Sequence, residues 1–148
     1  MPKETDIRPA GAALYLLPVE TRVPLKFGPE TLTHVTCARV RLEVVDRAGR
    51  RAEGWGETPL SVQWVWPSAL PYAERSAALE TFTQALADAW AAFGAWGHPL
   101  EVGHAFIEGA LPALLESMNA RRAGREPMPW LAALVCCSAY DLALHDAY

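Results

Sequence analysis

The sequence predicts an α+β fold, a three-stranded antiparallel β-meander followed by a helical bundle, and three observations support this class. The 148 residues suit one domain, and a chain of this length hides about 70% of its unfolded surface on folding. Before Pro67 the apolar residues tend to alternate with polar ones, as in strands. After Pro67 they recur every three or four residues, as in helices. We therefore expect the sheet in the first half of the chain and the helices in the second.

Two neighbouring strands are predicted around a turn at Asp46–Gly49. Residues 38–45 alternate between apolar and mostly charged side chains, which indicates a strand with one buried face. The turn ends with Gly49, a residue that readily adopts the positive φ that many turns need. Arg51–Glu57 then returns antiparallel to the preceding strand.

An earlier strand is predicted at Leu14–Glu20, where Pro18 either ends the strand or confines it to a sheet edge. The connection from Thr21 to Leu32 is predicted as a long loop, because three of its positions are Pro or Gly. These are Pro24, Gly28 and Pro29. A loop of that length without structure of its own is usually functional or mobile.

Two amphipathic helices are predicted after Pro67. The first ends near Phe93, before Gly94 and Gly97. The second begins at Pro99, which suits a first helical turn, and is kinked or split at Pro112. The first helix has a stripe of Leu79, Phe82, Leu86, Trp90 and Phe93, and one side of the second carries Leu100, Ile107, Leu111, Leu114 and Met118.

A last helix is predicted at Trp130–Tyr148, after a solvated connector at Asn119–Pro129 that holds Arg121, Arg122 and Arg125. Residues 131–140 are apolar on every side, so this helix must be buried on more than one face. One small sheet and two helices are too few to cover it, so we expect a further partner. In the chain alone its outer face should be exposed and cause self-association, and we expect a homo-oligomer. That face is expected to contain Leu134, Cys137, Leu144 and Tyr148.

Charge and composition argue against several classes of partner. A net charge of −4 and a pI near 5.5 give no field that would attract nucleic acid. The longest apolar run, Trp130–Tyr140, is too short to cross a bilayer, and the first residues lack the apolar stretch of a secretory signal. Cys37, Cys136 and Cys137 are expected to be buried thiols in a reducing compartment. We therefore predict a cytoplasmic protein without nucleic-acid or membrane partners.

The residues that could bind a metal ion or form a catalytic pair lack the required spacing. The histidines are not spaced as ligands, and Cys136-Cys137 has no second cysteine pair. Asp141 and Asp146 lie five residues apart on a helix and are interpreted as structural. We therefore predict no catalytic residue and no metal ligand in this chain. The histidines are His34, His98, His104 and His145.

Two segments have the composition of recognition loops. Arg22–Phe27 places two cations and an aromatic ring on the predicted long loop, and Glu57–Pro67 places Trp64 and Trp66 on the connection that leaves the sheet. Loops carry function more often than scaffold elements do, and Arg, Trp and Phe are common anchors of recognition surfaces. The alternative is that the two tryptophans cap the core of the sheet.

Three motifs follow one another over nearly the whole chain. Arg22-Val-Pro-Leu-Lys-Phe-Gly28 follows the first strand, and Gly54-Trp-Gly-Glu57-Thr-Pro-Leu60 closes the meander. The last helix carries an Ala-x-Asp-x-Ala-x-x-Asp pattern at Ala139, Asp141, Ala143 and Asp146. In this order the motifs resemble the N-terminal capping domain of enolase-superfamily proteins of the mandelate racemase and muconate-lactonizing type.

The resemblance implies that residues 1–148 are a capping domain, with the meander and specificity loops in residues 1–66 and the helices in residues 67–148. The chain would end where a (β/α)₈ barrel begins. In the family, the loops after the first and third strands shape the substrate pocket, which corresponds to Arg22–Gly28 and Glu57–Trp66 here. The implied specificity residues are Arg22, Lys26, Phe27, Glu57, Trp64 and Trp66.

The barrel of such enzymes holds the catalytic groups, which are base lysines or a His–Asp dyad, and three carboxylates that bind magnesium. The resemblance therefore implies a magnesium-dependent isomerase or lyase, a racemase, dehydratase or cycloisomerase that removes the proton next to a substrate carboxylate. This chain alone should not catalyse the reaction. The alternative is a free-standing module that binds a small molecule with its aromatic loops or dimerises through its last helix.

Overall fold

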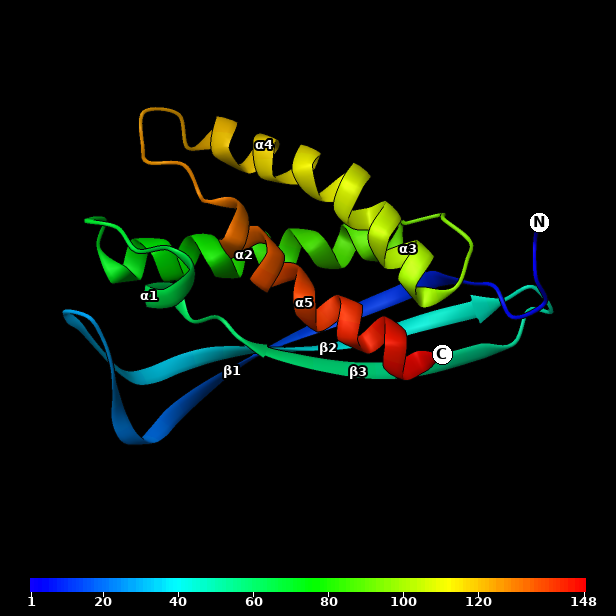
Figure 1. The fold of residues 1–148 in the computed structure, drawn as a ribbon, viewed down its shortest axis with the longest axis horizontal. Helices are drawn as coiled ribbons and strands as arrows, with labels where there is room; N and C mark the ends of the chain where they lie inside the picture. Colours follow the sequence, from blue (N-terminus) through cyan, green and yellow to red (C-terminus); the bar gives the residue numbers. More distant parts are fainter.

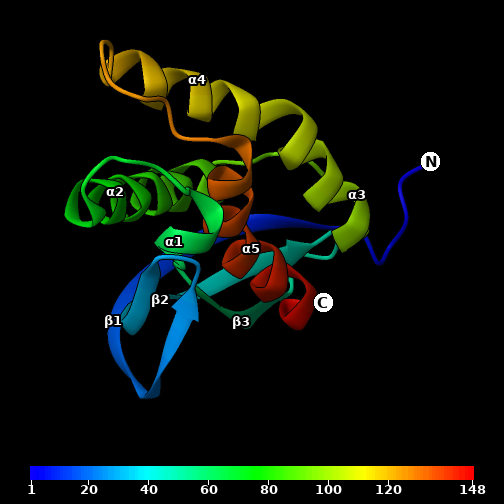
Figure 2. The ribbon, with the colours of Figure 1, turned by 60° about the vertical axis from the view of Figure 1, so that its left-hand side comes forward.

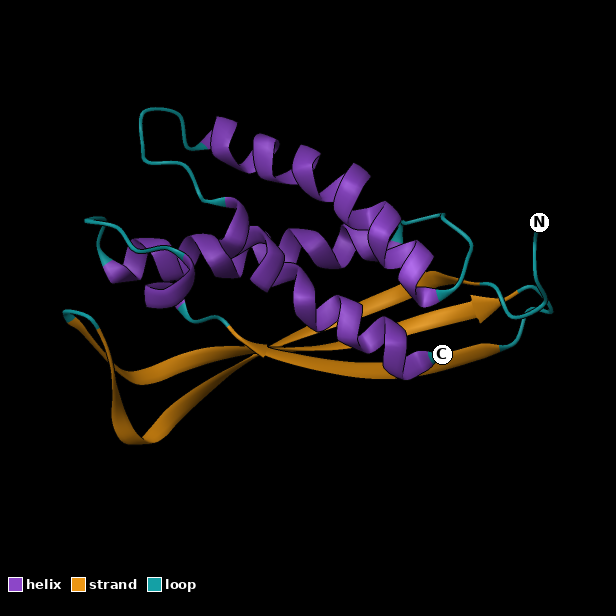
Figure 3. Ribbon diagram, viewed as in Figure 1, coloured by secondary structure: helices purple, strands orange, loops and turns teal.

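The protein has two layers, a three-stranded antiparallel sheet and a layer of helices on one of its faces (Figures 1 and 3). This computed structural model describes residues 1–148 apart from the side chain of Phe27. The strands, in sheet order, are β1 (Ile7–Phe27), β2 (Glu30–Asp46) and β3 (Arg51–Pro59). The helices are α1 (Val62–Val65), α2 (Tyr72–Ala91), α3 (Pro99–Ala105), the π-helical η1 (Phe106–Ala110), α4 (Leu111–Arg121) and α5 (Trp130–Ala147). The predicted α+β class with a three-stranded meander is confirmed, and the described part of the chain forms no barrel.

The first hairpin is longer than predicted, and the predicted loop from Thr21 to Leu32 is wrong. β1 continues to Phe27, and a two-residue turn at Gly28–Pro29 leads into β2. Gly28 has a φ of 58°, the left-handed conformation that suits such tight turns. Prolines did not end β1, because β1 is an edge strand and a missing N–H is tolerated there.

The far part of this hairpin is irregular and bends away from the rest of the sheet (Figure 2). Between the Glu20–His34 and Leu25–Leu32 pairs, β1 contains residues 21–24 where β2 contains Thr33 alone. The hydroxyl of Thr21 donates to the carbonyl of Thr33, 3.2 Å away. The additional residues therefore form an excursion of β1 and not a separate loop.

The core lies between the sheet and helices α2 and α5. The predicted stripe on α2 is confirmed for Leu79, Phe82, Leu86 and Trp90, which are all buried, while Phe93 beyond the helix is partly buried. The ring of Trp90 stacks on Phe106 at 4.0 Å and lies parallel to Tyr140 at 6.3 Å. The hydroxyl of Tyr140 donates to the carbonyl of Thr83 at 2.7 Å. These aromatic contacts join α2, η1 and α5.

The predicted break near Pro112 is confirmed, because α3 and α4 are separated by the π-helical turn η1. Pro112 has no N–H for a bond to the preceding turn, which favours a local change of helical pitch. The prediction that Leu100 lies on the buried side is wrong, since its side chain is 67% exposed. Val102, two residues along the helix and on the opposite side, is the buried residue of this turn.

α5 confirms the last predicted helix but corrects the prediction of its exposed face. Cys137 and Leu144, expected to lie outside, are buried, and Leu134 is partly buried. α5 packs on β2 and β3 and also contacts α1, α2, α3 and α4, so this domain covers more of the helix than we expected. The large apolar residues of α5 and its C-cap that remain exposed are Trp130, Leu131, Leu142 and Tyr148. No helix among the described residues is long and apolar enough to cross a membrane.

Candidate functional site

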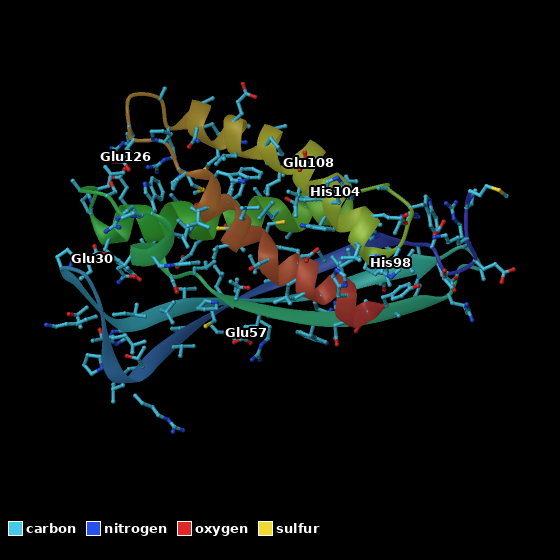
Figure 4. The ribbon with its side chains drawn as sticks, in the orientation of Figure 1. Glu30, Glu57, His98, His104, Glu108 and Glu126 are labelled. Atoms are coloured by element: carbon cyan, nitrogen blue, oxygen red, sulfur yellow. The ribbon has the colours of Figure 1, made fainter. Side chains whose placement is uncertain are left out.

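The two segments predicted to shape a pocket lie near each other at one end of the sheet. We call this end, made of residues 21–34 and 60–66, the hairpin end. The N–H of Leu60 donates to the carbonyl of Thr36 at 2.8 Å, which holds the start of the segment after β3 beside β2. Figure 4 shows Glu30 at the tip of the hairpin, near α1 and the start of α2. The fold therefore brings together segments that are about 30 residues apart in the sequence.

Arg75 joins the two segments at the hairpin end. Its side chain, on α2, is only 2% exposed. One terminal nitrogen donates to the carbonyl of Trp66 at 2.7 Å, and the other donates to the carboxylate of Glu30 at 2.8 Å. Sequence reasoning missed this residue. The signal was present, because Arg75 lies four residues before Leu79 and so extends the apolar stripe of α2 with a charged side chain.

Trp66 is part of the core of this domain and not an exposed specificity residue. Its side chain is 1% exposed, and its indole N–H donates to Glu126 at 2.9 Å. The guanidinium of Arg122 lies over the ring, 5.2 Å from its centroid, although the connector that holds it was predicted to be solvated. The hydrogen bonds that Ser68 and Trp66 donate to Glu126 lower the pKa of this carboxyl below its ordinary value. For Trp66 the alternative interpretation, a cap on the core, therefore describes the structure.

Trp64, Arg22 and Lys26 remain available to a ligand. Trp64 on α1 is 57% exposed, and the cations of Arg22 and Lys26 are exposed on β1. The side chain of Phe27, the other residue predicted for this segment, lies outside the described part of the structure. Their role in substrate recognition stays a prediction.

A shallow hollow separates the hairpin from the start of the helical layer. Each lining residue carries a polar group, and the hydroxyl of Thr33 and Nδ1 of His34 lie within hydrogen-bond distance, 2.9 Å apart. The lining residues are Glu30, Thr31, Thr33, His34, Gln63 and Tyr72. This hollow gives the hairpin end a concave surface with both polar and apolar groups.

Glu57 does not join this group. It lies part-way along β3, away from Glu30 (Figure 4), and pairs with Arg39 at 2.7 Å. Arg39 and Glu57 are cross-strand neighbours, and both side chains are more than 40% exposed. Nearby, the rings of Tyr15 and Trp55 stack with centroids 6.0 Å apart. The predicted specificity residues are thus divided between the hairpin end, the core and the sheet.

The described side chains form no group of three or more His, Cys, Asp or Glu residues that could hold a metal ion. Figure 4 shows His98, His104 and Glu108 far from Glu30 at the hairpin end. His98 accepts a hydrogen bond from the N–H of Leu100 and caps α3, so it has a structural role. The described side chains at the hairpin end therefore include exposed cations, an exposed tryptophan and a shallow hollow, and they do not form a metal centre.

The second and third sequence motifs are in direct contact. A Cβ atom on Gly54 or Gly56 of β3 would overlap the backbone of α5 at Ala143 and Ala139, respectively, so only glycine allows this close approach. The hydroxyls of Thr58 and Ser138 are 2.6 Å apart at the same interface. Residues that are widely separated in the sequence thus form one tight strand–helix contact.

No protein-family sequence profile and no curated protein matches this chain. Among solved structures, a mandelate racemase/muconate lactonizing protein from Herpetosiphon aurantiacus matches 95% of this chain and 30% of its own, with 15% identity and a TM-score of 0.41. L-Talarate dehydratase from Polaromonas sp. JS666 matches 93% of this chain and 31% of its own, with 13% identity and a TM-score of 0.43. A mandelate racemase/muconate lactonizing enzyme-like protein from Rubrobacter xylanophilus matches 93% of this chain and 29% of its own, with 22% identity and a TM-score of 0.38.

Two of these three solved proteins carry the name of the family that the sequence motifs resemble. The chain spans about 30% of the length of each matched chain. At these identities and scores the likeness gives no information about activity, which has to be argued from the residues of the chain itself.

Proposed function

We propose that this chain is the substrate-capping and specificity part of a magnesium-dependent enolase-superfamily enzyme, joined to a (β/α)₈ barrel that carries the chemistry. The enzyme removes the proton next to the carboxylate of a small substrate and acts as a racemase, dehydratase or cycloisomerase. The capping part closes over the barrel, and its hairpin end faces the substrate.

The contact between β3 and α5 is the observation that carries this proposal. The glycines of the second motif and the alanines of the third motif are the residues that allow the two backbones to approach. Two of the three motifs on which the resemblance rests therefore build one structural unit, which supports the resemblance. The remaining motif, Arg22–Gly28, lies in the far part of the hairpin, on the end of β1 and its turn, and the resemblance implies that this segment helps to shape the substrate pocket.

Charge at the hairpin end supports a carboxylate as the substrate. Arg22 and Lys26 are both exposed there, and a carboxylate is a suitable partner for either cation. Trp64 adds an exposed aromatic surface on the neighbouring segment. These side chains would recognise the part of the substrate that is remote from the reacting carbon.

Magnesium does not fit the residues of this chain, because its described side chains gather no set of three metal ligands. The proposal therefore assigns the metal to the barrel, together with the catalytic base. When bound there, magnesium stabilises the negative charge that develops on the enolate oxygens during proton removal. The 148-residue chain contributes binding and exclusion of water, and it has no activity alone.

The exposed residues of α5 support the barrel as the partner. Leu131 and Leu142 are each more than 40% exposed on this helix, and the C-terminal Tyr148 is 53% exposed. Apolar side chains of this size are candidates for burial against a second domain. We further propose that the enzyme is cytoplasmic, because Cys37, Cys136 and Cys137 are free thiols, and that it is a homo-oligomer.

Proton exchange in D₂O tests this function. A protein that contains this chain and its barrel is incubated with L-glucarate or mandelate, with magnesium or with EDTA, and the α-proton signal is followed by NMR. We expect magnesium-dependent loss of that signal with at least one carboxylic acid of such a panel, and no loss with the 148-residue chain alone. A gene in which no barrel follows the codon of Tyr148 would contradict the proposal and favour the free-standing module.

A further inference from the structure

The junction between the far part of the hairpin and the helical layer depends on one ion pair. Among the described residues, Glu30 and Arg75 make the one hydrogen bond or ion pair that joins residues 21–34 to the helices. The other polar contacts of the side chains in this segment lie within the hairpin, as between Thr21 and Thr33. The position of the hairpin tip relative to α2 is therefore sensitive to this pair.

Arg75 is a buried cation with few ways to compensate its charge. The guanidinium is 2% exposed, and Nε has no partner among the described residues. Its neutral acceptor is the carbonyl of Trp66, and Glu30 is the carboxylate that it contacts directly, while the carboxylate of Glu126 interacts with it electrostatically without a hydrogen bond. A buried charge without its counterion is strongly unfavourable, so the folded domain favours conformations in which Glu30 stays on Arg75.

Glu30 is well placed to act as a latch. It is the first residue of β2, directly after the Gly28–Pro29 turn, so an interaction of its side chain restrains the position of the hairpin tip. Its side chain is 35% exposed, so it can leave Arg75 without crossing the core. Trp66, the second partner of Arg75, is buried and donates a hydrogen bond to Glu126, so it is anchored independently of the hairpin.

We propose that Arg75 is a positioning residue that holds the hairpin tip and the segment after β3 together as one wall of the substrate site. The wall consists of Glu30 and its strand on one side and α1, which ends next to the buried Trp66, on the other. The latch is a property of this chain, while its effect on the substrate rests on the proposed function.

Hydrogen exchange of the 148-residue chain tests the latch directly. Glu30→Gln keeps the shape of the side chain and removes its charge, and Glu20→Gln is the matched control at an exposed carboxylate of the same hairpin. We expect Glu30→Gln to raise amide exchange in residues 24–33 about tenfold, while exchange in residues 38–45 is unchanged. The Glu20→Gln variant should show the same amide exchange in residues 24–33 as the parent chain.

A second variant separates the charge of Arg75 from its geometry. Arg75→Lys keeps the positive charge but offers one nitrogen in place of the two that reach Trp66 and Glu30. It should raise exchange in residues 24–33 as Glu30→Gln does. Exchange in this segment that is equal in the parent chain and in both variants would overturn the latch.

The barrel-containing enzyme tests the effect on the substrate. Glu30→Gln should raise KM for the carboxylate several-fold and leave kcat within about twofold, because Glu30 positions the wall and does not touch the reacting atoms. If Glu30→Gln raises amide exchange in residues 24–33 but leaves KM unchanged, the positioning role is overturned. Failure of the proposed function has a different signature, the absence of magnesium-dependent proton exchange in the parent enzyme, and it leaves the exchange result on the latch intact.

Discussion

The backbone N–H of Trp55 donates a hydrogen bond to the carboxylate of Asp146, 2.8 Å away. Trp55 lies on β3, one of the two edge strands of the sheet, where unpaired N–H groups can pair with a strand of another molecule. Asp146 satisfies one of these groups from the last turn of α5. The aspartate of the third motif is therefore a structural partner of the second motif, in agreement with its interpretation from the sequence.

The first prediction concerns the approach of α5 to β3. Gly56→Ala would place a Cβ atom against the backbone carbonyl of Ala139, which cannot move aside as a flexible side chain could. We expect a loss of unfolding free energy of about 3 kcal/mol or more, measured by urea denaturation. Gly94→Ala is the control, because a Cβ atom there meets nothing within 4 Å. Equal midpoints for the two variants would contradict the close packing.

The spacing of apolar residues predicted most of the fold, because it stays regular along most strands and helices of the chain. Leu79 to Trp90 repeat at helical spacing, and this stripe is the part of the core that α2 contributes. The extended hairpin was missed because Pro18 and Pro24 resemble strand breakers, and only the position of β1 at a sheet edge makes them acceptable. Strand order is a tertiary property that a local pattern does not contain.

The candidate site was less predictable, because exposure decides which residues are available. Trp64 and Trp66 are the same residue type two positions apart in one segment, yet Trp64 is exposed and Trp66 is buried. Arg75 was overlooked because its importance comes from the two segments that meet at its guanidinium. Leu144 was assigned to the outer face of α5 because the number of elements that cover this helix was underestimated.

The corrected face of α5 gives a second prediction. Leu144 is fully buried in the core, whereas Leu142, two residues earlier, is 51% exposed. Leu144→Lys places a charge in the core and should lower the unfolding free energy by at least about 3 kcal/mol. Leu142→Lys should change it by less than about 0.5 kcal/mol. Similar denaturation midpoints for the two variants would show that the orientation of α5 is wrong.

The buried thiols give a third prediction. Burial raises the pKa of Cys136 and of Cys137 to about 12, so neither thiol forms the reactive thiolate near neutral pH. Cys37 also has a raised pKa, from its smaller burial and from the nearby carboxylate of Glu57. In the folded protein we expect a thiol reagent such as DTNB to label Cys37 first and the other two only on unfolding. Peptide mapping that finds Cys136 labelled as fast as Cys37 would contradict the core assignment.

The last prediction follows from the lowered pKa of Glu126. Ser68 and Trp66 donate hydrogen bonds to its carboxylate, so the charged form is favoured in the folded protein relative to the unfolded chain. A group with a lowered folded pKa stabilises fully above its ordinary value, here 4.5, and this contribution is lost as the pH falls through the folded pKa. Acidification should therefore remove part of the stability that depends on Glu126.

A comparison of the parent chain with Glu126→Gln measures this effect, because the amide keeps the shape and does not titrate. Urea denaturation at a series of pH values gives the difference in unfolding free energy between the two proteins. We expect this difference to be constant above about pH 5 and to shrink as the carboxylate is protonated at lower pH. A difference that widens on acidification would mean that folding raises the pKa of Glu126, which is incompatible with the hydrogen bonds from Ser68 and Trp66.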